Sequence, residues 1–145
     1  MDEHLRINVM GAFRVAQAAS REMIATGGGR IVMVTSIHGQ IGVPGRGAYA
    51  ASKGAVAAMA RVMAVELARH RIRVNVLAPG AVDGGMTPDP TSRIGWVAAT
   101  PSGRVAHLDE IARVAVTLTS EDLSFINGQV IAVDGGASTL RVFPA

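Results

Sequence analysis

The run Arg30-Ile31-Val32-Met33-Val34-Thr35-Ser36 is short, rich in β-branched residues and preceded by glycines. This composition predicts a strand that is buried on both faces of a sheet. Two further runs, at residues 72–77 and 130–133, have the same character, and Ala78-Pro79-Gly80 closes the first of them with a turn signal. The sequence therefore predicts three buried strands.

Helical patterns separate these strands. Apolar residues recur among charged ones up to about residue 26, residues 48–69 are nearly apolar all round, and Asp109 and Glu110 open a third helix that runs to about residue 120. A helix that is apolar all round must be covered on two sides, by the sheet and, we expect, by a partner subunit. Residues 83–103 contain several prolines and are interpreted as a surface loop.

Helices that alternate with buried strands predict an α/β fold with parallel strands, because each right-handed crossover returns the chain to the same end of the sheet. Residues 1–145 are long enough for one domain with a single core. Ligands in such sheets bind beyond the carboxyl ends of the strands. Those ends are expected at Ser36, Pro79-Gly80 and Asp134.

Composition narrows the function classes. The chain has 49% hydrophobic residues, no cysteine and a net charge of +3, and the absence of cysteine excludes disulfides and thiolate chemistry. Its arginines are scattered, and the one short cluster, Arg69, Arg71 and Arg73, has no aromatic platform or basic run beside it. A nucleic-acid-binding module is therefore a minor alternative that salt-dependent retention on DNA or RNA would identify. No run resembles a signal peptide or a membrane span. We expect a cytoplasmic protein with no nucleic-acid, membrane or metal partner.

The most informative pair is Tyr49 and Lys53, the only tyrosine and the only lysine of the chain, four residues apart on one face of an expected helix. A phenol with a pKa of about 10 is a poor base at neutral pH. One ammonium about 4 Å away favours the phenolate by about 4 kcal/mol at an effective dielectric constant near 20. The pair therefore predicts acid/base chemistry. The alternative is that Tyr49 packs and Lys53 extends to solvent.

Ser36 ends the first strand before Tyr49, and here the sequence resembles a known family. Ser36, the run Tyr49-Ala50-Ala51-Ser52-Lys53 and Asn8 resemble the Asn-Ser-Tyr-Lys tetrad of the short-chain dehydrogenases/reductases. The surrounding segments that agree with the family are Ile7-Asn8-Val9-Met10-Gly11, Gly29-Arg30-Ile31-Val32, Gly47-Ala48-Tyr49, Ile72-Arg73-Val74-Asn75, Pro79-Gly80-Ala81-Val82, Gly128-Gln129 and Val133-Asp134-Gly135-Gly136. The resemblance covers nearly the whole chain and implies the C-terminal half of a partial Rossmann-like, doubly wound parallel sheet.

The resemblance also implies roles. Tyr49 would exchange a proton with an alcohol or carbonyl substrate while hydride moves to or from NAD or NADP, and Ser36 would polarise the same oxygen. Lys53 would lower the pKa of the phenol and hold the nicotinamide ribose, and Asn8 would order a water near Lys53. Pro79, Gly80 and Val82, with Tyr49 and Lys53, would contact the cofactor. Considered without the family, Asn8 is equally a polar helix residue and Ser36 a strand-end cap.

One segment departs from the family pattern. The threonine that commonly follows the aspartate of this segment is displaced to Thr87, after Asp83 and Gly84-Gly85-Met86. His38 is interpreted as a solvated loop histidine, with a place in the substrate pocket as the alternative. Substrate identity and the choice between NAD and NADP are not readable from these residues.

The sequence also contains no glycine-rich turn between a strand and a helix, where a dinucleotide fold binds pyrophosphate. About 90 residues of the family pattern, at roughly 30 per βαβ unit, are absent from it. We expect weak cofactor binding and little turnover by this chain alone. It is either part of an ordinary oxidoreductase or, alternatively, a non-catalytic oligomerising remnant. Residues 30–35 lack their expected neighbouring strand, so we expect a homo-oligomer with residues 5–25 and 48–69 at the interface.

Overall fold

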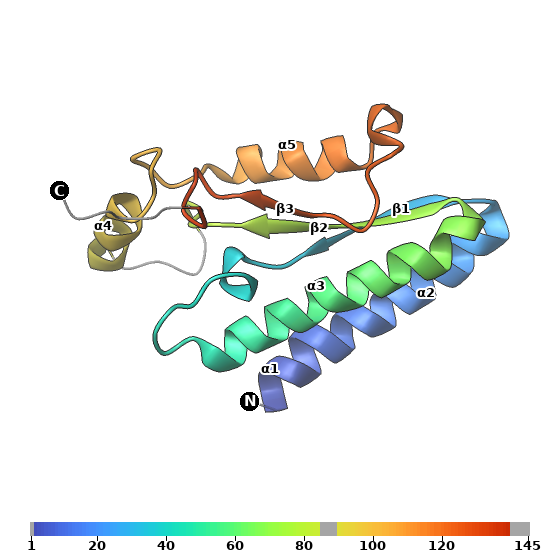
Figure 1. The fold of residues 1–145 in the computed structure, drawn as a ribbon, viewed down its shortest axis with the longest axis horizontal. Helices are drawn as coiled ribbons and strands as arrows, with labels where there is room; N and C mark the ends of the chain where they lie inside the picture. The colour runs from blue at the N-terminus through green and yellow to red at the C-terminus, as the bar shows by residue number, and fades with distance from the viewer. Residues whose placement is uncertain (1, 85–89, 140–145) are drawn as a thin grey trace.

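The computed structural model describes residues 2–84 and 90–139 and contains one parallel sheet in the order β1-β2-β3 (Figure 1). The strands are β1 (Gly29–Val34), β2 (Ile72–Pro79) and β3 (Val130–Val133). Gly29 is in register with Ile72, and Val76 with Val130. The predicted strands and their parallel pairing are confirmed.

Helices cover both faces of this sheet. The helices α2 (Ala12–Thr26) and α3 (Gly47–Leu67) lie side by side on one face, and α5 (Leu108–Leu118) lies on the other (Figure 1). The short helix α1 (Asp2–His4) and a π-helical turn (Leu5–Gly11) lead into α2. Single 3-10 turns at Ile37–Gly39, Ala68–His70 and Glu121–Leu123 complete the helical segments. This arrangement is part of a Rossmann-like fold, as predicted.

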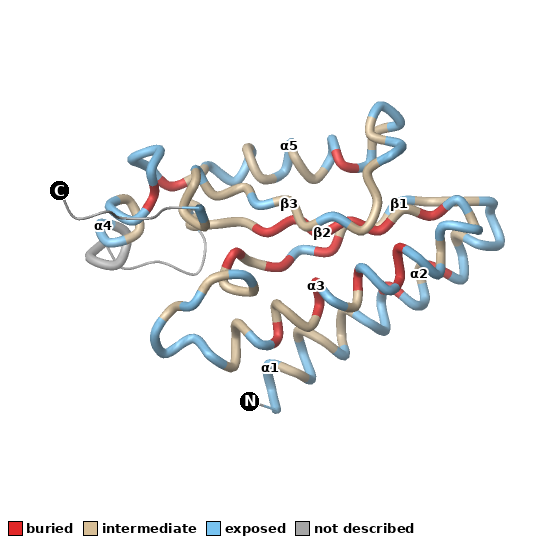
Figure 2. The backbone as a smooth tube through the Cα atoms, viewed as in Figure 1, coloured by how far each residue is buried: buried red, intermediate tan, exposed pale blue. Residues whose placement is uncertain are grey.

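The core lies between the sheet and the α2/α3 layer (Figure 2). Ile72, Val74 and Val76 of β2 are fully buried, because β2 is the central strand and both its faces are covered. On α3, Val56, Ala60, Met63 and Ala64 are buried and belong to the same core cluster as these β2 residues. This packing fixes the start of α3, and with it Tyr49, relative to the ends of the strands.

The interpretation of residues 83–103 as an irregular loop is wrong in part, because this segment contains the helix α4 (Pro90–Ala98). Its prolines indicated a loop, yet proline is well tolerated at the first position of a helix, where its missing N–H leaves no bond unmade. Pro90 occupies that position. Thr87, to which the sequence displaces the threonine of the family pattern, lies outside the described residues.

Strand β1 lies at an edge of the sheet, since within the described part of the chain it pairs with β2 alone. Val34 of this strand is 57% exposed. An edge strand of this kind presents unpaired backbone groups to a further strand or a partner. Within the described residues, β1 is therefore a strand at which a further strand or a partner could pair.

Candidate functional site

A pocket of about 200 Å³ opens at the carboxyl ends of β1 and β2. Residues from the end of β1, the loop before α3, the first turn of α3, the end of β2 and α4 converge on it. The lining residues are Thr35, Ser36, Ile37, His38, Arg46, Tyr49, Pro79, Gly80, Ala81, Val82 and Trp96. The sequence predicted ligand binding at this edge of the sheet, and five of its candidate residues line the pocket: Ser36, Tyr49, Pro79, Gly80 and Val82.

Ser36 follows β1 in an extended conformation and caps the turn Ile37–Gly39. Its Oγ accepts a hydrogen bond of 3.2 Å from the His38 N–H. A hydroxyl that accepts in this way keeps its own proton for donation. Ser36 is therefore both a strand-end cap and a donor that can polarise an oxygen in the pocket, so the two interpretations of this residue are compatible.

Tyr49 and Lys53 occupy the first two turns of α3. The Nζ atom of Lys53 lies 5.6 Å from the centroid of the Tyr49 ring, and burial lowers the pKa of Lys53. Tyr49 lines the pocket and Lys53 does not. The structure thus brings the cation to the side of the phenol, as the four-residue spacing predicted, with only the phenol reaching the pocket.

Asn8 lies in the π-helical turn and contacts α3 beside the Tyr49/Lys53 pair. Its Nδ2 donates to Ser52 Oγ at 3.0 Å, and Ser52 Oγ donates to the carbonyl oxygen of Tyr49 at 2.7 Å. Single π-helical turns are frequent at functional sites. The contact fixes the start of α3 against the N-terminal helices, and the predicted ordering of a water by Asn8 stays a prediction.

Close backbone packing shapes the β2 side of the pocket. The Gly80 N–H donates to Val133 at 3.1 Å, and a Cβ atom at Gly80 would lie 2.8 Å from the Cβ of Asp134. Glycine is therefore required for the ends of β2 and β3 to approach. Beyond it, the Ala106 N–H donates to Ala81 at 3.0 Å and keeps Val82 beside the pocket.

The residues Pro79 to Val82 fit the nicotinamide end of a dinucleotide, since they offer a fixed backbone beside a hydroxyl pair. The pocket volume of about 200 Å³ is below the roughly 300–1,000 Å³ of sites that enclose a drug-sized ligand. It therefore has room for the reacting end of a cofactor, and the remainder would need further contacts.

Sequence reasoning did not single out Arg46 or Trp96, which also line the pocket, and its preferred interpretation of His38 as a solvated loop residue is wrong. The His38 ring stacks on Trp96 with centroids 5.3 Å apart and meets the Tyr49 ring edge-on at 5.8 Å. Its Nδ1 atom is buried and has no hydrogen-bond partner among the described residues. Burial, followed by the positive charge of Arg46, lowers the pKa of His38. The position of His38 two residues after Ser36 was the only signal available.

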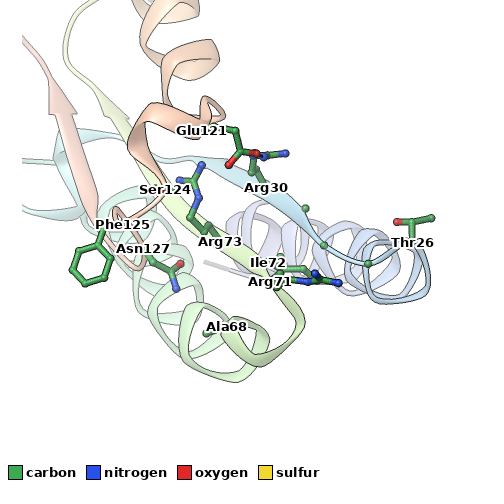
Figure 3. Close-up of a pocket in the computed structure, with 13 residues that line it drawn as sticks. Thr26, Arg30, Ala68, Arg71, Ile72, Arg73, Glu121, Ser124, Phe125 and Asn127 are labelled. Carbon is green, nitrogen blue, oxygen red and sulfur yellow. Dashed lines mark ion pairs between the residues drawn. The ribbon is translucent and has the colours of Figure 1, made fainter.

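A larger hollow of about 800 Å³ lies at the opposite, amino ends of β1 and β2 (Figure 3). Arg73 donates there to the carbonyls of Leu118, Ser120 and Ile126 at 3.3, 2.9 and 3.1 Å, and Arg30 pairs with Glu121. These arginines join the end of α5 to the sheet. We therefore assign a structural role to the arginines of this hollow. The hollow contains neither Tyr49 nor Ser36.

The structure describes residues 2–84 and 90–139. Within them, no group of three or more histidine, aspartate or glutamate side chains is placed to hold a metal ion. No helix in the same ranges has the length and apolar character needed to cross a bilayer.

Comparison with known proteins gives one consistent match. The sequence model of a family described as enoyl-(acyl carrier protein) reductase matches residues 1–138. The 3-oxoacyl-(acyl-carrier-protein) reductase MabA of Mycobacterium tuberculosis is 44% identical over 134 residues, which are 91% of this chain and 54% of that protein. The gluconate 5-dehydrogenase of Gluconobacter oxydans is 39% identical over 139 residues, 93% of this chain and 54% of that protein.

Solved structures agree with the sequence matches. A gluconate 5-dehydrogenase from Burkholderia cenocepacia, in complex with NADP and tartrate, superposes with a TM-score of 0.89 at 36% identity and covers 94% of this chain. The match covers 55% of that protein. The chain therefore spans about half the length of the relatives that it matches.

Proposed function

The chain belongs to the short-chain dehydrogenase/reductase family, and from that premise we propose that its pocket interconverts a hydroxyl and a carbonyl group, with Tyr49 as general acid/base. One observation carries the proposal: the hydroxyls of Ser36 and Tyr49 line one pocket at the carboxyl ends of the strands, with the Lys53 ammonium against the Tyr49 ring. A donor and an acid/base that face the same space can act on one substrate oxygen.

Each residue has a distinct part in this proposal. Tyr49 takes the proton of the substrate hydroxyl in the oxidation direction and returns it in the reduction direction. Ser36 donates a hydrogen bond to the same oxygen with its own O–H, while its oxygen accepts from the His38 N–H. Lys53 holds a positive charge beside the phenol ring. Asn8 positions α3 through Ser52.

The cofactor in the proposal is NAD or NADP, whose nicotinamide accepts or supplies the hydride. Tyr49, Lys53, Pro79, Gly80 and Val82 would hold its nicotinamide end. NADP is the cofactor named with the Burkholderia relative. We expect weak binding by residues 1–145 alone, because the sequence has no glycine-rich turn that opens a helix after a strand. The affinity is measured by adding NADH or NADPH and recording the fluorescence emission of Trp96. Tight saturable binding would contradict the expectation.

Turnover tests the proposal directly. Hydride transfer is followed by reduced-nicotinamide absorbance with a 3-oxoacyl thioester and with gluconate, the substrate classes in the names of the relatives. We expect Tyr49→Phe and Ser36→Ala each to lower the rate, the former by about 10²–10⁴-fold. Ser124→Ala, in the hollow at the far end of the sheet, is the control and leaves the rate unchanged. A turnover rate that is unchanged in Tyr49→Phe would refute the role of Tyr49.

We also propose that the chain self-associates through α2 and α3. Val15 of α2 is 71% exposed and Val65 of α3 is 80% exposed. Both lie on the side of the helical layer that faces away from the sheet. Burying such residues against a second copy removes apolar surface from water. Self-association without any turnover would favour the alternative function, a non-catalytic oligomerising member of the family.

A further inference from the structure

One wall of the pocket offers a positive charge and hydrogen-bond donors, from Arg46 and His38. Arg46 immediately precedes α3, and in the described part of the chain its guanidinium has neither a carboxylate partner nor a capping hydrogen bond. It lines the same pocket as Ser36 and Tyr49. A guanidinium has five N–H donors and no acceptor, so its complement is an anion.

His38 forms the second part of this wall. Its ring lies between Tyr49 and Trp96, and its Nδ1 atom is buried without a partner in the described residues. A buried polar group without a partner carries a desolvation penalty, which a bound ligand can relieve. Burial and the charge of Arg46 lower the pKa of His38, so that the ring is neutral at neutral pH and has one N–H to donate.

The balance of charge on the pocket is positive. Among the described residues that line it there is no aspartate or glutamate, whereas Arg46 is present as a cation. Arg46 also precedes Tyr49 by three residues, and His38 follows Ser36 by two. The cationic wall is therefore adjacent to the two hydroxyls. A carboxylate can accept from Arg46 and His38 while a neighbouring substrate oxygen contacts Ser36 and Tyr49.

From this juxtaposition we infer that the pocket selects hydroxy acids and oxo acids, with Arg46 and His38 binding the substrate carboxylate and Trp96 forming the apolar wall beside it. The inference rests on the proposed function, since the reacting oxygen is placed at Ser36 and Tyr49. It adds two specificity-determining residues to the site and names the class of substrate.

The test compares two ligands that differ in charge and little in shape, 3-hydroxybutyrate and 3-hydroxybutyramide. Binding to the 145-residue chain is measured through Trp96, the only tryptophan, whose indole stacks on His38. We expect the carboxylate to change the emission saturably, with a Kd at least about tenfold below that of the amide. This ratio corresponds to the free energy of one charge-assisted hydrogen bond. Arg46→Gln should abolish the difference. The matched control Arg113→Gln, on the exposed surface of α5, should retain it.

Variants of His38 separate its two contributions. His38→Leu removes the hydrogen-bonding group, and we expect it to weaken carboxylate binding by about tenfold, whereas His38→Gln retains a donor and should lose less. Equal affinity for the two ligands, no saturable binding of the carboxylate, or a preference that survives Arg46→Gln would each overturn the inference. Because these measurements involve no hydride transfer, the proposed oxidoreductase function would be judged separately by the turnover assay.

Discussion

Individual residues carry the chemistry of this pocket through the contacts that fix them. Ser36 accepts a hydrogen bond from the backbone and still has its own O–H to donate, and Tyr49 is fixed because Ser52 donates to its carbonyl oxygen and Asn8 donates to Ser52. Ser36, Tyr49 and Lys53 were predictable from the sequence, since helix periodicity and strand ends determine their relative placement. The position of His38 depends on a ring from α4, which no local pattern specifies.

The pKa of Glu110 is lowered by its hydrogen bonds, and this makes part of the stability of the fold depend on pH. Its carboxylate accepts hydrogen bonds from Arg104 at 2.7 and 2.8 Å and from the His107 N–H at 2.9 Å, and these contacts lower its pKa from 4.5 to about 2. A carboxyl with a depressed pKa in the folded state stabilises the fold above its unfolded pKa, and this stabilisation is lost as the pH falls toward the folded value. We therefore expect Glu110→Gln to unfold at lower urea concentration than the wild type at neutral pH.

The difference between Glu110→Gln and the wild type should shrink as the pH falls from about 4.5 to about 2. Urea unfolding at a series of pH values measures it, and Glu22→Gln on the exposed side of α2 serves as the control. A difference that is constant across this pH range would show that the Arg104 contact does not persist in solution.

At the scale of elements, the site depends on how the turn Ile37–Gly39 packs against α3. A Cβ atom at Gly39 would lie 3.0 Å from the backbone of Lys53 and of Gly54. The helix backbone cannot yield easily, so the turn itself would have to move. This turn carries His38 and is capped by Ser36, and its displacement would therefore disturb the pocket.

We predict that Gly39→Ala lowers the free energy of unfolding by about 1–3 kcal/mol, the usual range for overpacking, and shifts the emission of Trp96 through movement of His38. Gly42→Ala is a matched control, because a Cβ atom there would meet nothing within 4 Å. Thermal unfolding and emission spectra of the two variants make the comparison. Wild-type behaviour of Gly39→Ala would mean that the contact between the turn and α3 is loose.

At the scale of the whole molecule, two surfaces compete as sites of self-association. One is the exposed side of α2 and α3, and the other is the free edge of β1. The helical side presents apolar residues with satisfied backbone groups, whereas the strand edge presents unpaired backbone groups. The two routes can be separated by substitutions on each surface.

We expect Val65→Glu to convert an oligomer to a monomer, because the interface would have to bury its charge. Val116→Glu is the control, since Val116 is 70% exposed on α5, which covers the other face of the sheet (Figure 1). Light scattering at micromolar concentration gives the mass. Dissociation by Val34→Lys alone would instead assign association to the edge of β1, and a monomeric wild type would contradict self-association altogether.

Local periodicity and spacing predicted the three strands, the helices α2, α3 and α5 and the Tyr49/Lys53 pair, because these features are set over a few residues. The alternation of helices and strands then predicted the parallel pairing. Only the tertiary structure decided that α4 lies within residues 83–103 and that Trp96 stacks on His38 beside Arg46. Those contacts join segments that follow different strands. They form because parallel strands bring their carboxyl ends to one edge of the sheet, and which side chains meet there depends on packing across the whole fold.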